Sequence, residues 1–271
     1  MSGIIKKVRT LRPLVHCITN YVTVNDCANI ILAAGGTPTM AQDRREVEEI
    51  VAISSALVLN IGTVGDIEAM ALAGKRANAL GKPVVLDPVA AGASGLRNDC
   101  CAYLRKEVRF SVIRGNISEI KALAVGKSDN RGVDAGEADR VTEDTLSSVC
   151  DMAKRLSQDT GAVIAISGEL DIVSDAKRTC VIRNGCSEMA QITGSGCMLT
   201  SVIGAFCGAA PDDVFTATVQ AVAALGYCGE LARKKMCEMH AGTASFRTYM
   251  IDAMSLLTDE GLEGGMRIEV R

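Results

Sequence analysis

The 271-residue sequence predicts a three-layer α/β protein, in which a mainly parallel sheet lies between two layers of helices. Short β-branched runs alternate with longer helical patterns along the chain, and several of these runs are apolar throughout, as in Val84, Val85 and Leu86. A strand without polar alternation is covered on both faces, which is the situation of a parallel sheet between helices. We find no linker or repeat, so we treat residues 1–271 as one domain with no separate lid domain.

The strands are expected where β-branched residues cluster between turn signals. These segments are residues 14–18, 56–61, 83–87, 111–114, 162–167, 171–174, 179–183 and, at the end, 266–270. The helices between them have start and stop signals. A helix over 24–34 ends at Gly35 and Gly36, and one over 66–80 ends at Gly81.

Three further segments have helical patterns. Residues 45–54 have an apolar side, and residues 142–159 begin with Glu143 and Asp144, which suit the positive end of a helix dipole. Residues 196–257 are rich in Ala and are expected to be nearly all helical. The polar segment 126–139 is expected to be a surface loop and not a domain boundary.

Composition excludes several classes of protein. The chain has 29 basic and 32 acidic residues, 3% aromatic residues and no Trp, so it offers neither a basic surface nor a stacking platform for nucleic acid. Eleven cysteines, an odd number, with no secretory signal before them indicate reduced thiols in the cytoplasm. No CxxC pair exists and the His residues are His16 and His240, so zinc is not expected.

One stretch, residues 189–211, contains no charged residue, which raises the question of a membrane span. Its apolar part, residues 197–210, is shorter than the roughly 20 residues that cross a bilayer. We therefore expect a buried helix and no membrane association.

A glycine-rich turn, Gly194-Ser195-Gly196, precedes this apolar helix. The glycines let the backbone approach a ligand, and the helix N-terminus favours an anion. The turn fits neither a P-loop, since it has no Lys, nor a dinucleotide fingerprint, since Leu199 replaces the third glycine. A helix-capping turn remains the alternative. Cys197 lies in the first turn of the helix, where a thiol is readily ionised, although packing would also explain it.

Polar residues also follow successive strands. Arg114 can pair with a phosphate, and the carboxylates of Asp87 and Glu119 can hold Mg²⁺, usually through water. Ser167 ends a later strand, and Met40 offers an adaptable apolar contact near the N-terminus. The alternatives are a strand-to-loop transition at Asp87, a helix cap at Glu119 and ordinary packing of Met40.

Parallel strands present their carboxyl ends at one edge of the sheet, where ligands bind. Positioning groups, a metal and donors for developing charge are the parts that phosphoryl transfer needs. From the residues alone, the sequence therefore indicates an α/β enzyme that uses a nucleotide or a phosphate.

Six segments carry a resemblance to a known family. They are residues 13–25 (PLVHCITNYVTVN), 33–41 (AAGGTPTMA), 59–63 (LNIGT), 84–89 (VVLDPV), 113–119 (IRGNISE) and 192–200 (ITGSGCMLT). Together they resemble the hydroxyethylthiazole kinases of the ribokinase-like superfamily. The resemblance implies ATP- and Mg²⁺-dependent phosphorylation of the primary hydroxyl of 4-methyl-5-(2-hydroxyethyl)thiazole in thiamine biosynthesis or salvage. It also implies a homotrimer with active sites at subunit interfaces.

The resemblance assigns roles to the candidate residues. Met40 and Gly194 match substrate contacts, Arg114 and Ser167 match ATP contacts, and Asp87 and Glu119 match the acids linked to Mg²⁺ and the phosphates. Cys197 stands where the wider superfamily has a catalytic Asp, and we expect it to position the hydroxyl and accept its proton. Ala90 replaces a Gly that is common in relatives.

Three other functions are disfavoured by particular residues. A hydroxymethylpyrimidine kinase of the same superfamily is disfavoured by segment 13–25 and by Cys197, and a dinucleotide-dependent oxidoreductase by the missing third glycine. A non-catalytic thiazole sensor is disfavoured by the presence of Arg114, Glu119 and Cys197.

Overall fold

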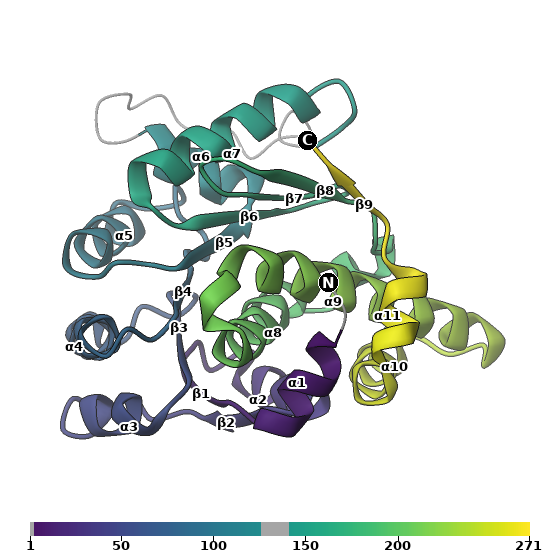
Figure 1. Ribbon diagram of the computed structural model, residues 1–271, viewed down its shortest axis with the longest axis horizontal. Coiled ribbons are helices and arrows are strands. Elements are labelled where there is room, and N and C mark those ends of the chain that lie inside the picture. The colour runs from purple at the N-terminus through teal and green to yellow at the C-terminus, as the bar shows by residue number, and fades with distance from the viewer. Residues whose placement is uncertain (1–2, 126–140) are drawn as a thin grey trace.

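The computed structural model describes residues 3–125 and 141–271, so the expected loop at 126–139 lies outside the described residues. Over this part the chain forms three layers, with a sheet between two layers of helices (Figure 1). The predicted α/β class is therefore confirmed.

The described residues form a nine-stranded sheet in the order β2-β1-β3-β4-β5-β6-β7-β8-β9. All pairings from β2 to β6 are parallel, and those of β7, β8 and β9 are antiparallel. The strands are β1 (Leu14–Ile18), β2 (Thr37–Thr39), β3 (Ala56–Asn60), β4 (Val84–Asp87), β5 (Val112–Asn116), β6 (Val163–Ser167), β7 (Asp171–Ser174), β8 (Thr179–Ile182) and β9 (Ile268–Val270).

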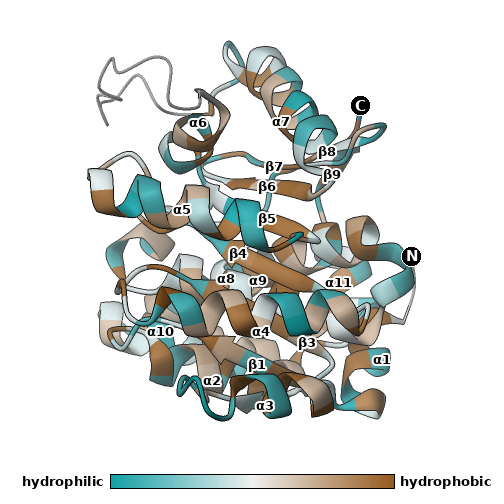
Figure 2. Cartoon of the chain, turned by 90° about the vertical axis from the view of Figure 1, so that its left-hand side faces the viewer, coloured by the Kyte–Doolittle hydropathy of each residue, from teal (hydrophilic) through white to brown (hydrophobic). Residues whose placement is uncertain are grey.

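Helices cover both faces of the sheet (Figures 1 and 2). One layer contains α1 (Ile4–Leu11), α2 (Val24–Ala34), α8 (Ser195–Ala209), α9 (Val214–Glu238), α10 (Thr243–Leu256) and α11 (Asp259–Gly265). The other contains α3 (Val47–Ile53), α4 (Ile67–Ala79), α5 (Gly95–Glu107), α6 (Ile117–Val125) and α7 (Leu146–Thr160). Along β3, Val58 packs into the first core, whereas Leu57 and Leu59 pack into the second. This alternation explains the continuously apolar strands.

The apolar stretch after the glycine turn forms α8, which is almost wholly buried against β1, β3 and β4. Gly204 allows this close approach, because a Cβ at that position would lie 2.6 Å from Val58 Cγ2. Among the described residues, one helical segment, Pro211–Glu238, is long and apolar enough to cross a membrane. Since 72% of its apolar window is buried in the protein, it serves here as a core helix.

The structure differs from the sequence-based expectations in several elements. The helices α1, α5 and α11 were not predicted, nor was β2, a three-residue edge strand with a central proline. The helix expected from residue 142 begins at Leu146, because the Thr145 hydroxyl accepts the Thr142 N–H and forms a turn first. The helical region 196–257 is interrupted at Pro211 and again before Gly242.

Candidate active site

The carboxyl ends of the parallel strands bring the candidate polar residues to one edge of the sheet. Asn60 of β3 pairs in register with Asp87 of β4, and Asn116 of β5 pairs with Ser167 of β6. Arg114 lies two residues before the end of β5. Register pairs Arg114 with Ala165, two residues before Ser167, so Arg114 reaches Ser167 through the length of its side chain.

Arg114 connects three parts of the site. Its guanidinium donates to the Ser167 hydroxyl, and its Nη1 lies 3.6 Å from Asp87 Oδ2. A Cβ at Gly196 would lie 2.8 Å from Arg114 Nη2, so the glycine turn packs directly against the guanidinium. The Arg114 Nε is buried and has no hydrogen-bond partner among the described residues.

Asp87 is fully buried at the end of β4. Its Oδ2 accepts from Thr200 Oγ1 at 2.7 Å and from Asn60 Nδ2 at 3.0 Å, whereas its Oδ1 has no partner in the described part of the chain. Burial raises the pKa of Asp87 to about 6, and Glu119 adds to the rise while Arg114 opposes it. An unpartnered carboxylate oxygen beside an unpartnered guanidinium nitrogen is a place for a ligand with both cationic and anionic parts.

Glu119 holds two backbone segments together. Its Oε1 accepts from the Ala90 N–H and its Oε2 from the Asn116 N–H, both at 2.8 Å. The Asn116 side chain accepts from the Glu119 N–H at 2.9 Å, so the expected helix cap is present. Ala90 adopts a left-handed backbone with φ of 59°, a conformation that glycine adopts at lower cost.

Within the described ranges, no group of three or more His, Cys, Asp or Glu residues could hold a metal ion by itself. The donor set still fits Mg²⁺, since this ion keeps several waters and uses one or two carboxylates together with substrate phosphates. Asp87 Oδ1 is the oxygen that is free to accept such a water.

The glycine turn forms the N-terminus of α8. Gly194 is the N-cap, with φ of 86°, and it has no side chain to accept from the first-turn amides at Ser195, Gly196 and Cys197. A Cβ at Gly194 would also lie 2.8 Å from Thr23 Cγ2. Because Gly196 packs against the Arg114 guanidinium, these amides lie close to the strand ends, where an anion would bind.

The Cys197 sulfur contacts two side-chain amides, those of Asn20 and Asn60, to which no role was assigned from the sequence. Asn20 Nδ2 donates to Sγ at 3.4 Å and Asn60 Nδ2 at 3.2 Å. Each asparagine follows or ends a buried strand, β1 or β3, and that position was the available signal. Cys197 itself is half-buried, and each of the eleven cysteines is a free thiol.

Two residues qualify the sequence prediction. Met40 directly follows the edge strand β2, and its side chain is half-buried against the core. The strand β1 lies between β2 and β3, the strand that carries Asn60. Asp171, which was not singled out as a site residue, accepts from the Gly168 N–H. Burial raises the pKa of Asp171 to about 7, and nearby Arg114 opposes the rise.

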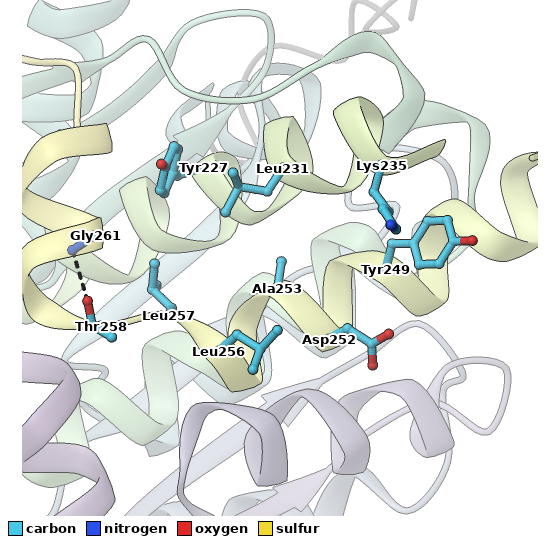
Figure 3. Close-up of a pocket in the computed structure, with 10 residues that line it drawn as sticks. All are labelled: Tyr227, Leu231, Lys235, Tyr249, Asp252, Ala253, Leu256, Leu257, Thr258 and Gly261. Carbon is cyan, nitrogen blue, oxygen red and sulfur yellow. Dashed lines mark hydrogen bonds between the residues drawn. The ribbon is translucent and has the colours of Figure 1, made fainter. Parts of the chain in front are cut away.

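A separate cavity of about 400 Å³ lies between α9, α10 and α11 (Figure 3). Its walls are largely apolar, with Lys235 and Asp252 among its lining residues. None of the predicted site residues lines it. The charged and unpartnered groups Asp87 and Arg114 lie instead at the strand ends.

A buried arginine and two acids beside a helix N-terminus, at the carboxyl edge of this sheet, define a small-molecule kinase of the ribokinase-like class. Solved structures agree with this class. A hydroxyethylthiazole kinase from Pyrococcus horikoshii superposes with a TM-score of 0.87 at 31% identity, covering 99% of this chain and 97% of that one. A pyridoxal kinase from Staphylococcus aureus, at 14% identity and a TM-score of 0.58, shares the fold.

Sequence comparison then gives the particular family. Residues 5–260 match the model of the hydroxyethylthiazole kinase family. A hydroxyethylthiazole kinase from Desulfovibrio desulfuricans is 52% identical, covering 99% of this chain and 97% of the relative. One from Clostridium acetobutylicum is 49% identical, covering 98% and 97%. The chain belongs to the hydroxyethylthiazole kinase family.

Proposed function

We propose that this protein transfers the γ-phosphoryl group of ATP to the primary hydroxyl of 4-methyl-5-(2-hydroxyethyl)thiazole. The observation that carries the proposal is the pair of buried, unpartnered atoms, Asp87 Oδ1 and Arg114 Nε, beside the N-terminus of α8. A nucleotide phosphate with its cation provides both an anion for Arg114 and a hydrated metal for Asp87. The family of the chain supplies the alcohol substrate.

The chain's own residues mainly position the phosphates and stabilise charge, as phosphoryl transfer requires. Arg114 and Ser167 hold the nucleotide. The backbone N–H groups of Ser195 and Gly196 stabilise the negative charge that develops on the transferred group. Asp87 and Glu119 would hold Mg²⁺ through water, and that ion neutralises phosphate charge when bound. Met40 and Gly194 contact the thiazole.

In this mechanism Cys197 touches the reacting hydroxyl. It orients the oxygen towards phosphorus and accepts its proton. Cys197→Ala is expected to lower kcat at least about tenfold, because the hydroxyl loses both its orientation and its base. Turnover close to that of the wild type would show that the sulfur is not the base.

The activity is tested by thiazole-dependent release of ADP from the purified protein. We expect release with ATP, Mg²⁺ and the hydroxyethylthiazole, and its loss when EDTA removes the metal. Hydroxymethylpyrimidine in place of the thiazole is the control substrate. Release with the pyrimidine alone would keep the phosphoryl chemistry and overturn the substrate, and release with neither would overturn the proposed reaction and point to another alcohol or to a binding protein on this fold.

We also propose a cytoplasmic homotrimer with active sites at subunit interfaces. Tyr21 and Val22 support an interface there, since they are 76% and 60% exposed and directly follow the site residue Asn20. The nearby segment 30–34 is mostly core, since Ile30, Ile31 and Ala34 are buried and Leu32 is its exposed apolar residue.

A further inference from the structure

The Cys197 sulfur belongs to a network of side-chain amides that the mechanism above does not use. Asn20 and Asn60 both donate to it, at 3.4 Å and 3.2 Å. Both asparagines are buried, at 4% and 1% exposure, although they come from segments 40 residues apart. A buried amide is costly unless its hydrogens and its oxygen are satisfied, so the direction of each amide carries information.

The orientation of each amide follows from its oxygen. Asn20 Oδ1 accepts from the backbone N–H and the hydroxyl of Thr23, at 3.2 Å and 3.1 Å. Asn60 Oδ1 accepts from the Gly62 N–H at 2.8 Å and from Asn20 Nδ2 at 3.1 Å. Reversing either amide would set its nitrogen against these donors, so both NH₂ groups must face the sulfur.

Each amide hydrogen has one acceptor. Asn20 donates to Asn60 Oδ1 and to Cys197 Sγ, and Asn60 donates to Asp87 Oδ2 and to Cys197 Sγ. Gly62 packs closely against both amides, since a Cβ there would lie 2.8 Å from Asn20 Nδ2 and 2.9 Å from Asn60 Oδ1. The two donors are therefore fixed before any substrate binds.

We propose that Asn20 and Asn60 are positioning residues that hold the Cys197 sulfur as a hydrogen-bond acceptor and stabilise its thiolate. A neutral thiol is a weak acceptor, whereas a thiolate gains from two fixed N–H donors in a partly buried site. The inference rests on the proposed function, in which Cys197 meets the substrate hydroxyl.

The amides prepare the sulfur to take the proton of the substrate hydroxyl during phosphoryl transfer. The substrate O–H bond breaks and its proton passes to the thiolate, which becomes a thiol. The oxygen's electron pair forms the new bond to the γ-phosphorus. The bond from that phosphorus to the β–γ bridging oxygen breaks, and ADP leaves with the electron pair. The thiol then returns its proton to water.

Asn20 is the residue to test, because Asn60 also binds Asp87 and its loss would disturb that acid. Asn20→Asp keeps the oxygen that accepts from Thr23 and replaces the donating nitrogen with another oxygen. Asn20→Ala removes the whole group. The matched control is Asn29→Ala on α2, an exposed amide that donates to Asn25 and not to the sulfur.

The first measurement does not depend on turnover. Alkylation of Cys197 by iodoacetamide at fixed pH is followed by mass spectrometry of its peptide, since thiolates react and thiols do not. We expect both Asn20 variants to slow this reaction about tenfold, the scale of one lost hydrogen bond to a charged group, and Asn29→Ala to leave it unchanged.

The second measurement is kinetic. The Asn20 variants should lower kcat about tenfold and leave the KM for ATP unchanged, because the proposed nucleotide contacts, Arg114 and Ser167, do not include this amide. In a Cys197→Ala background, Asn20→Asp should lower kcat little further. The amide of Asn20 acts on kcat through the Cys197 sulfur, which this background lacks. If Asn20→Ala does not fold, the isosteric Asp variant still decides the question.

An unchanged alkylation rate in the folded Asn20 variants would overturn the proposal, and so would a full additional loss of kcat in the Cys197→Ala background. Failure of the proposed function has a different result. In that case the wild type phosphorylates neither alcohol, while the Asn20 variants still slow alkylation.

Discussion

Asp87 shows how a single residue links stability to function. Its carboxyl group is fully buried, and burial raises its pKa to about 6 from an ordinary value of 3.8. As pH rises from about 4 to 6, the unfolded chain releases this proton more readily than the folded chain does. The folded state therefore loses stability over that interval. Natural proteins keep such costly charges where a ligand needs them.

This loss of stability can be measured by comparing the wild type with Asp87→Asn, whose side chain cannot ionise. Between pH 4.5 and 7.5 the free energy of unfolding of the wild type should fall relative to the variant by about 2 kcal/mol. Urea unfolding of both proteins at the two pH values, without Mg²⁺ or nucleotide, checks this. A relative stability of the wild type that rises with pH would contradict the burial argument.

At the scale of elements, α8 sets the geometry of the site. The helix packs against β1, β3 and β4, and its N-terminus carries the glycine turn and Cys197. Gly204 is the close contact: a Cβ there would lie 2.6 Å from Val58 Cγ2 and 3.1 Å from Val15 Cγ1. A side chain at this position would push the helix away from the sheet.

Gly204→Ala is therefore expected to destabilise the protein by about 1–3 kcal/mol, the usual cost of overpacking, although Ala favours helices. Gly264→Ala in α11 is the matched control, since nothing lies within 4 Å of its Cβ position. The control should be neutral or stabilising by up to about 1 kcal/mol. Thermal or urea unfolding measures both. Equal stabilisation by the two substitutions would show that a methyl group fits between α8 and the sheet, which would contradict the close contact at Gly204.

At the scale of the whole molecule, the proposed trimer makes turnover depend on assembly. Three chains of 28.4 kDa give a particle of about 85 kDa in sedimentation analysis. Val22→Glu should reduce both this mass and the turnover per chain, because it places a charge in the expected interface. Leu80→Glu, at the C-terminal end of α4 and 40% exposed, is the control and should change neither. A 28.4 kDa monomer with full turnover would contradict the interface.

Much of the architecture could be read from the local sequence. The segments at β1, β7 and α2 have the bounds that were predicted, because apolar runs and glycine stops act locally. Local patterns failed at β2, where three residues around a proline pair only with their neighbour β1. They failed also at residues 142–145, where a hydroxyl bond delays the helix.

By itself, the sequence determined the sheet class, the family and most of the candidate residues. Segment 192–200 and the charged residues after the predicted strands can be recognised in the linear sequence, without knowledge of the fold. Only the tertiary structure decided which of those residues meet. It placed Arg114 between Ser167 and Asp87, put Met40 directly after the edge strand β2, and brought two asparagines to the sulfur of Cys197. The physical reason is that strand register and the close packing of α8 fix distances between residues far apart in the chain.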